Sequence, residues 1–285
     1  MRSEKVATVA IRRFDGTNFH TEDDLLVVEE PLEIRLGFGE PENRQQKSIA
    51  VTMRTPGNDL ELAAGFLFGE GIINQKSDIL SIDHCRDAGQ QENPQNIVRV
   101  ELTPNISPDL HQLERHFYTT SSCGICGKAS IEAVRATGCE LLPEAVPQVD
   151  LDMLLALPEK LKLSQPAFRH TGGLHAAGFF SATGELLWIC EDVGRHNALD
   201  KLIGVALFSN KLPLPEGVIL VSGRGGFELI QKTVRAGGQI FAAVGAPSNL
   251  AVELARQFRL TVVGFLRENR CNIYTFESRI RYPNS

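Results

Sequence analysis

Residues 218–265 read VILVSGRGGFELIQKTVRAGGQIFAAVGAPSNLAVELARQFRLTVVGF, and the fold class of the chain can be predicted from them. Short apolar runs typical of buried strands alternate in it with amphipathic segments typical of helices. The predicted strands are Val218–Val221, Ile240–Val244 and Thr261–Phe265, and the predicted helices are Glu228–Ala236 and Leu250–Phe258. This alternation predicts an α/β layer with a largely parallel central sheet.

The same alternation continues on both sides of that stretch. The additional predicted elements are the strands Leu186–Cys190 and Asn272–Thr275 and the helices Lys128–Thr137, Leu151–Leu163 and Asn197–Phe208. Glycine and proline residues separate them, as expected between regular elements. We therefore assign residues 121–285 to one α/β domain.

The first 120 residues have a different character. Alternating or β-branched apolar residues predict the strands Val6–Arg12, Leu32–Gly37, Ile49–Arg54 and Ile97–Leu102. One helix is predicted through Leu60–Leu67, capped by Asn58 or Asp59 and ended by Gly69 and Gly71. We expect residues 1–120 to form a smaller β-rich domain around an antiparallel sheet.

Composition narrows the functional classes. The chain has 285 residues, of which 42% are hydrophobic and 22% charged, so we expect a globular protein. Its net charge is -6, so we do not expect it to bind nucleic acid or anionic membranes in a general way. The N-terminus lacks the apolar core of a signal peptide, and no run approaches the roughly 18 apolar residues of a membrane span. We expect a cytoplasmic protein whose six cysteines are reduced thiols.

Cys123 and Cys126 form a C-x-x-C motif directly before a predicted helix. A helix N-terminus and the nearby Lys128 favour the thiolate, the nucleophilic form of cysteine. Zinc binding, thiol redox chemistry and a merely structural pair remain open for this motif. A zinc site would need distant partners such as His170, His175 or His196, because no second C-x-x-C exists.

Polar and glycine-rich loops follow four of the predicted strands. They are residues 191–197, 222–226, 245–249 and 264–270. Ligands in α/β sheets gather beyond the carboxyl ends of the strands, and glycine N–H groups, helix N-termini and arginines all bind phosphate. A nucleotide or another polyphosphate ligand is therefore expected. The alternatives are ordinary turns, a local ion pair between Asp192 and Arg195, and an inert core thiol at Cys190.

Several blocks of the sequence match one family. The chain resembles the formate dehydrogenase accessory sulfurtransferase, or sulfur carrier, family. The blocks that carry the resemblance are residues 62–73 (LAAGFLFGEGII), 122–127 (SCGICG), 168–177 (FRHTGGLHAA), 191–201 (EDVGRHNALDK), 222–224 (SGR) and 265–270 (FLRENR). Residues 225–227 and Cys271 differ from the commoner residues at those places.

This resemblance implies a sulfurtransferase that accepts persulfide sulfur from a cysteine desulfurase. It would pass the sulfur to the molybdenum bis(molybdopterin guanine dinucleotide) cofactor, bound as substrate, before that cofactor enters formate dehydrogenase. Cys123 would carry the persulfide and Cys126 would assist. No permanently bound metal is expected. A homodimer is expected, because the cofactor has two guanine nucleotide arms.

The resemblance also assigns the cofactor site. The residues expected to bind the cofactor are Phe265, Leu266, Arg267, Glu268, Asn269 and Arg270, with a second set of Ser222, Gly223, Arg224, Asp192, His196 and His175. Arg267, Arg270 and Arg224 would bind phosphates, Phe265 or Asn269 would meet a base, and Asp192 would accept N–H groups of a guanine edge.

The family is related in fold to the cytidine deaminases, which implies a three-layer α/β core. A zinc deaminase is thus one alternative, but residues 117–122 lack the zinc ligand and the glutamate two residues after it that such enzymes place upstream of the C-x-x-C. A chaperone that binds the molybdenum cofactor without handling sulfur is the other alternative.

Overall fold

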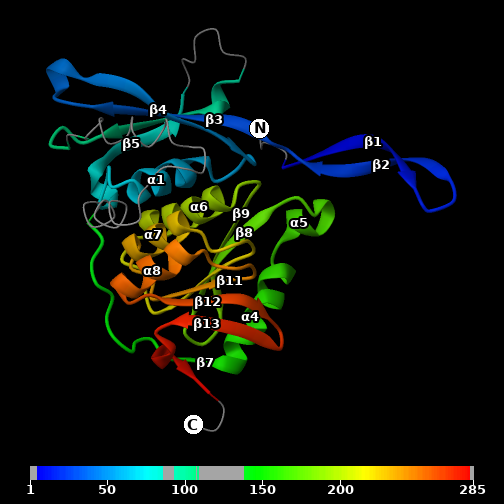
Figure 1. The fold of residues 1–285 in the computed structure, drawn as a ribbon. Helices are drawn as coiled ribbons and strands as arrows, with labels where there is room; N and C mark the ends of the chain where they lie inside the picture. Colours follow the sequence, from blue (N-terminus) through cyan, green and yellow to red (C-terminus); the bar gives the residue numbers. More distant parts are fainter. Residues whose placement is uncertain (1–4, 86–92, 107, 109–137, 283–285) are drawn as a thin grey trace.

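The computed structural model describes residues 5–85, 93–106, 108 and 138–282, and its centre is a six-stranded sheet (Figure 1). The strand order is β13–β12–β11–β10–β8–β9. The strands are β8 (His175–Ser181), β9 (Leu186–Asp192), β10 (Gly217–Val221), β11 (Ile240–Ala243), β12 (Thr261–Arg267) and β13 (Arg270–Thr275). The alternation of strands and helices predicted for this part of the chain is confirmed.

The direction of the strands differs from the prediction of a largely parallel sheet. β10, β11 and β12 are parallel neighbours, whereas β8 pairs antiparallel with β9 and β10, and β13 pairs antiparallel with β12. For the pairs β8–β9 and β12–β13 the physical reason is the length of the connections. Short turns join β8 to β9 and β12 to β13, and a short turn can join only antiparallel strands.

Helices cover both faces of this sheet, which gives three layers. On one face lie α6 (Arg195–Phe208), α7 (Phe227–Arg235) and α8 (Asn249–Phe258). On the other face lies α4 (Leu151–Leu163), followed by α5 (Pro166–Thr171). Each face has its own cluster of buried apolar side chains. The α/β class is confirmed, while the closer kinship with cytidine deaminases stays a prediction.

A second, four-stranded sheet is formed by the N-terminal part of the chain, with the order β4–β3–β6–β5. Its strands are β3 (Glu30–Phe38), β4 (Gln45–Arg54), β5 (Ile79–His84) and β6 (Ile97–Leu102). The sheet is not purely antiparallel as predicted, because β3 and β6 are parallel. They can be parallel because α1 (Asp59–Gly69) and β5 lie between β4 and β6 in the chain and return it to the same side.

The helices α1 and α6 join the two sheets into one structure. A side-chain carbon added to Gly65 would collide with the backbone oxygen of Asp200, and one added to Gly204 would collide with the backbone oxygen of Glu61. The two helices therefore pack backbone against backbone. One hydrophobic core runs from the four-stranded sheet through both helices to the six-stranded sheet. The predicted domain boundary at residues 120 and 121 lies outside the described residues.

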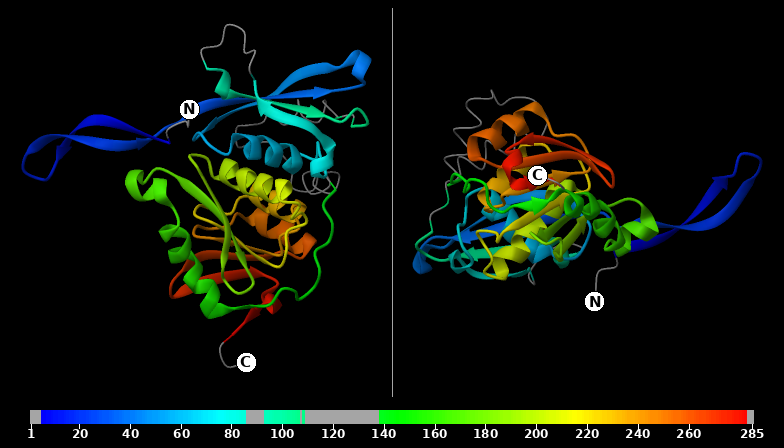
Figure 2. Two further views of the ribbon diagram at one scale, coloured as in Figure 1. Left: turned by 180° about the vertical axis from the view of Figure 1, so that it is seen from behind. Right: turned by 90° about the horizontal axis from the view of Figure 1, so that it is seen from below.

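A long hairpin extends from the body of the molecule (Figures 1 and 2). It consists of β1 (Val6–Phe14) and β2 (Phe19–Val27), and the second of these was not predicted from the sequence. The remaining short elements are β7 (Val149–Asp150), β14 (Ile280–Arg281) and the 3-10 helices Pro41–Asn43, Lys76–Asp78, Pro94–Asn96 and Glu277–Arg279. Within the described part of the chain, no helix is both long and apolar enough to cross a membrane.

Candidate functional site

One edge of the six-stranded sheet collects the four loops expected to bind ligand. β10, β11 and β12 run in the same direction, and β9 runs with them because both β9 and β10 are antiparallel to β8. Their carboxyl ends therefore lie along one edge. The first residues of β8 and β13, His175 and Arg270, lie at that edge too. The predicted convergence of the loops is confirmed.

Backbone hydrogen bonds hold these loops to one another. Gly245 N donates to Gly223 O at 2.9 Å, Gly225 N donates to Ala246 O at 3.0 Å, and Phe265 N donates to Gly245 O at 3.0 Å. The prediction that the glycine N–H groups would bind phosphate is wrong for Gly225 and Gly245, because these donors are already used between the loops. These two N–H groups are therefore not available to an anion.

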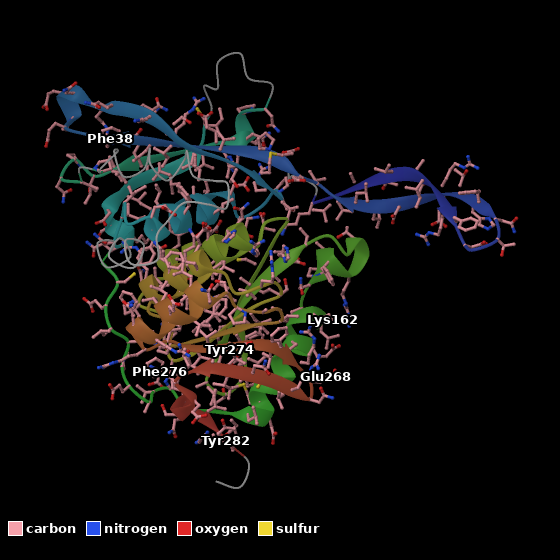
Figure 3. All side chains as sticks on the ribbon, viewed as in Figure 1. Phe38, Lys162, Glu268, Tyr274, Phe276 and Tyr282 are labelled. Atoms are coloured by element: carbon pink, nitrogen blue, oxygen red, sulfur yellow. The ribbon has the colours of Figure 1, made fainter. Side chains whose placement is uncertain are left out.

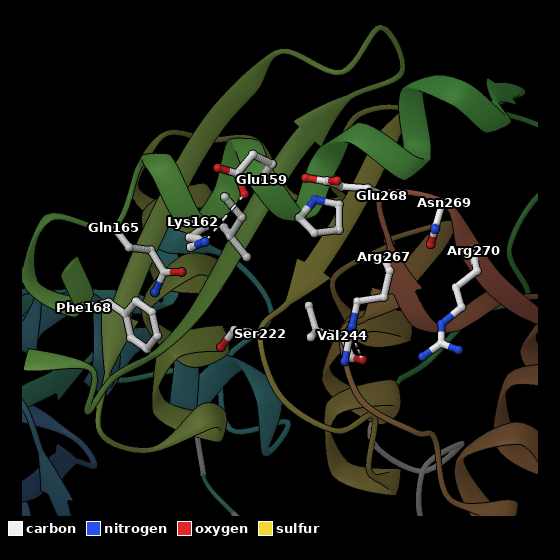
Figure 4. Close-up of a pocket in the computed structure, with 12 residues that line it drawn as sticks. Glu159, Lys162, Gln165, Phe168, Ser222, Val244, Arg267, Glu268, Asn269 and Arg270 are labelled. Atoms are coloured by element: carbon white, nitrogen blue, oxygen red, sulfur yellow. Dashed lines mark hydrogen bonds and ion pairs between the residues drawn. The ribbon is translucent and has the colours of Figure 1, made fainter. Parts of the chain in front are cut away.

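A pocket of about 650 Å³ opens at this edge, between α4 and the turn from β12 to β13 (Figure 4). A cavity of that size suits a small organic ligand. Its lining consists of Pro158, Glu159, Leu161, Lys162, Gln165, Phe168, Ser222, Val244, Arg267, Glu268, Asn269 and Arg270. Figure 3 places Lys162 and Glu268 on the same side of the molecule. Five of the predicted cofactor residues thus line one cavity.

The side chain of Arg267 is held in place at the pocket wall. Its Nη1 donates to Val244 O at 2.6 Å and to Leu266 O at 2.9 Å. Arg270 and Lys162 add two further cations, while Glu159 lies 3.9 Å from the Lys162 ammonium and Glu268 brings a second carboxylate. The pocket is therefore polar, with three cations against two carboxylates, and a bound anion would be attracted to it.

A second polar cluster lies beside the pocket, and Ser222 belongs to both. Ser222 Oγ accepts a hydrogen bond from Ala176 N at 2.9 Å and lies 3.5 Å from His175 Nδ1. Arg195 and His196 begin α6 next to them, and the Arg195 Nε is buried without a hydrogen-bond partner among the described residues. The cluster brings three basic side chains to one place.

Both histidines of this cluster are held neutral at pH 7. Burial, reinforced by the positive charge of Arg195, lowers the pKa of His175. Burial, together with the charges of Arg195 and Lys232, lowers the pKa of His196 to about 4. His196 Nε2 lies 3.2 Å from Glu228 Oε2, and this contact is not an ion pair at pH 7 because the ring is neutral. A neutral imidazole can donate and accept a proton.

Comparison with known proteins identifies the family. The profile of the FdhD/NarQ family matches residues 27–281 of this chain. The chain belongs to the FdhD/NarQ family. A protein named sulfur carrier protein FdhD from Streptomyces avermitilis is 50% identical over 273 residues, which cover 95% of this chain and 93% of that protein. Another of that name from Mycolicibacterium paratuberculosis is 51% identical over 259 residues, which cover 90% of this chain and 92% of that protein.

A solved structure supports the fold of this FdhD/NarQ family member. The crystal structure of a protein from Desulfotalea psychrophila, described as a formate dehydrogenase accessory protein, superposes with a TM-score of 0.72. The match covers 98% of this chain and 100% of that chain at 22% sequence identity. The match extends over both sheets and shows that the two proteins share a fold.

Seven of the predicted cofactor residues do not line the pocket of this FdhD/NarQ protein. They are Phe265, Leu266, Gly223, Arg224, Asp192, His196 and His175. Leu266 is fully buried in the core beneath the sheet, so its predicted contact with a ligand is wrong. Phe265 lies within β12, is 40% exposed and has a φ of 52°.

Asp192 has a structural role in place of the predicted guanine contact. Its Oδ2 lies 2.6 Å from the Lys201 ammonium and accepts from Thr55 N at 3.2 Å. Its Oδ1 accepts from Gly194 N at 2.9 Å and from Asn197 Nδ2 at 3.0 Å. The carboxylate is fully buried and bonded to four donors, so it has no room for a ligand edge. The ion pair considered with Arg195 is instead made with Lys201.

The sequence predicts individual roles for three of the six cysteines. Cys123 and Cys126 lie outside the described residues, and their roles stay predictions. Cys190 is 4% exposed on β9, and burial raises the pKa of its thiol to about 12. The prediction that Cys190 is an inert core thiol is confirmed. Among the described residues, no group of three or more His, Cys, Asp or Glu side chains is arranged to hold a metal ion.

Sequence reasoning missed one wall of the pocket. Helix α4 was predicted with its correct bounds, but not that its last turn and the start of α5 would face the ligand loops. The residues concerned are Pro158, Glu159, Leu161, Lys162, Gln165 and Phe168. Gln165, which is 3% exposed, lies between the two helices, and its spacing along the chain gave no signal of this position.

Proposed function

We propose that this FdhD/NarQ family member is a sulfur carrier in the maturation of formate dehydrogenase. In this proposal it receives persulfide sulfur from a cysteine desulfurase and delivers it to the molybdenum bis(molybdopterin guanine dinucleotide) substrate. The observation that carries the proposal is the polar pocket at the carboxyl edge of the sheet, where Arg267, Arg270 and Lys162 gather. The names of the relatives, sulfur carrier proteins, support the same role.

The first chemical step proposed is a sulfur exchange. The Cys123 thiolate attacks the outer sulfur of the desulfurase persulfide, so a new S–S bond forms on Cys123 and the old one breaks. The desulfurase cysteine leaves as a thiolate. One neutral sulfur atom moves in this exchange, and no external oxidant or reductant is consumed.

The second step releases the sulfur. The Cys126 thiolate attacks the inner sulfur of the Cys123 persulfide, which forms the Cys123–Cys126 disulfide and expels hydrosulfide. Hydrosulfide would then replace an oxygen ligand of the molybdenum in the substrate, and that oxygen would leave as water with the proton of the hydrosulfide and one proton from solvent. The disulfide carries the oxidation, and a cellular dithiol reductant must reduce it before the next cycle.

The pocket serves in this account to bind the phosphates and one ring system of the substrate. Arg267 is the strongest candidate for a phosphate contact, because two carbonyl oxygens already orient its guanidinium at the pocket wall. Two nucleotide arms on one substrate favour a homodimer, with one arm in each subunit. Formate dehydrogenase is the acceptor of the finished cofactor.

A single substitution separates this proposal from its alternatives. Cys123→Ala is expected to retain guanine nucleotide binding and to lose formate dehydrogenase activity in cells, because the thiol and the pocket are chemically separate. Retained activity would instead favour a chaperone that binds the cofactor without handling sulfur. Stoichiometric zinc in the purified protein that is lost with Cys123→Ala would favour a metal site of the deaminase kind.

A further inference from the structure

Gln165 is a buried polar side chain on the wall of the pocket. It is 3% exposed, and its Nε2 has no hydrogen-bond partner among the residues that the structure describes. Buried polar groups in native proteins are almost always hydrogen-bonded, because leaving one unpaired costs free energy. An unpaired amide that lines a cavity therefore indicates a partner supplied by whatever fills the cavity.

The position of Gln165 is fixed by its backbone. Its N–H donates to Lys162 O at 3.3 Å, at the end of α4, and its carbonyl oxygen accepts from Arg169 N at 3.1 Å, in α5. The neighbouring Phe168 is anchored in turn, since its N–H donates to Glu191 Oε1 on β9 at 3.1 Å. Gln165 and Phe168 are thus presented to the cavity by a junction that is tied to the sheet.

The two sides of the pocket differ in chemistry. In Figure 4 the side chains of Gln165 and Phe168 stand on one side, and those of Arg267 and Arg270 stand on the other. The first side also carries Lys162, which lies 3.9 Å from Glu159, whereas the second side carries the two arginines. An anion fits the arginine side, and a flat ring with a polar edge fits the side of Phe168 and Gln165.

We propose that Gln165 is a specificity-determining residue that reads the polar edge of a ring packed against Phe168. A carboxamide offers a donor and an acceptor side by side. Its complement is a ring with an N–H next to a C=O, and guanine and pterin share this edge. The inference rests on the proposed function, whose substrate contains both ring systems. It identifies the end of the pocket at which one of these rings binds.

Calorimetric titration of the full chain tests this with three probes: GDP, a simple pterin and inorganic pyrophosphate. Gln165→Met keeps the side-chain length but removes the amide. It is expected to weaken binding of the ring that occupies the site by about tenfold or more, the usual scale for lost hydrogen bonds in a buried site, and to leave pyrophosphate binding unchanged. Arg267→Met is expected to weaken pyrophosphate binding.

A matched control separates this effect from a general loss of structure. Gln239 also has a buried amide atom without a partner among the described residues, yet it precedes β11 at the opposite edge of the sheet. Gln239→Met should therefore bind every probe like the wild type. Gln165→Asn, which withdraws the amide by one methylene, should repeat the selective loss if Gln165→Met folds poorly by thermal melting.

The outcomes are distinct. Loss with GDP alone assigns guanine to this site, and loss with the pterin alone assigns the pterin ring. GDP methylated at the guanine O6 lacks the edge, so if guanine is bound it should bind the wild type weakly and lose nothing further in Gln165→Met. Unchanged affinity of Gln165→Met for both rings would overturn the inference and leave the proposed function standing. A wild type that binds none of the probes would overturn the proposed function itself.

Discussion

The ammonium of Lys201 lies 2.6 Å from the carboxylate of Asp192, and at most 1% of either side chain is exposed. Lys201 Nζ also donates to Thr55 O at 2.8 Å, while Asp192 accepts from Thr55 N. This buried pair therefore ties α6 and the end of β9 to the N-terminal part of the chain. It sits directly behind the loop that begins at Asp192.

Removing the cation should destabilise the whole protein. Lys201→Met leaves the Asp192 carboxylate buried without its main partner, and breaking a buried pair in this way typically costs about 3–5 kcal/mol of unfolding free energy. Urea unfolding followed by circular dichroism measures the change. Lys211→Met, at an exposed position, is the matched control and should change stability by no more than about 0.5 kcal/mol. A loss in Lys201→Met as small as the control's would contradict this role.

The contact between α1 and α6 should not tolerate a methyl group. Gly204→Ala places a carbon against the backbone oxygen of Glu61, and the helices must separate. Overpacking of this kind costs about 3 kcal/mol, measured as a fall in the urea midpoint. Gly226→Ala is the control, because an added carbon there has no described neighbour within 4 Å. Equal stability of the two variants would show that the helices separate at little cost.

His196 should make stability depend on pH. Because burial lowers the pKa of this imidazole to about 4 in the folded protein, the unfolded chain, with a pKa near 6.5, binds more protons between these values. Keeping His196 neutral therefore contributes to the unfolding free energy fully above pH 6.5, and this contribution is lost as the pH falls toward 4. Between pH 6.5 and pH 4, His196→Gln should lose about 1 kcal/mol less unfolding free energy than the wild type, allowing for partial exposure of the ring. An NMR titration that gave His196 a pKa of about 6.5 or higher would refute the prediction.

Arg267 should contribute to anion binding and not to sulfur chemistry. Arg267→Ala is expected to weaken guanine nucleotide affinity by about 1.5–3 kcal/mol, the usual scale for a hydrogen bond to a charged group, and to leave persulfide loading intact. Arg256→Ala removes the same charge from an exposed face of α8 and should bind nucleotide normally. Unchanged affinity in Arg267→Ala would remove this residue from the site.

The sequence predicted most elements, because hydrophobic periodicity is local. The bounds of β6 and α4 match the prediction, and the four loops meet at one edge as expected. One error at the site had a local cause. The strand predicted to end at Phe265 continues to Arg267, and an irregularity at Phe265, which has a φ of 52°, places Leu266 in the same core cluster as Val263.

Other features depend on tertiary packing, which periodicity does not report. The acidic residues Glu22–Asp24 break the apolar pattern of β2, so this strand was not predicted from the sequence. It pairs with β1 in an extended hairpin and does not belong to a buried sheet. The strand order that makes β8 antiparallel to its neighbours is not encoded in any single strand. The position of α4 over the ligand loops likewise follows from how its apolar face packs, so Lys162 and Gln165 could not be assigned to the pocket from spacing alone.

The central claim is that Cys123 carries sulfur, and intact-protein mass spectrometry tests it directly. The purified chain is incubated with a cysteine desulfurase and cysteine, and its mass is compared with that of the Cys123→Ala variant. The wild type is expected to gain the mass of one sulfur atom, which a thiol reductant removes, and Cys123→Ala is expected to gain none. A sulfur adduct that forms equally on Cys123→Ala, or none on the wild type, would contradict it.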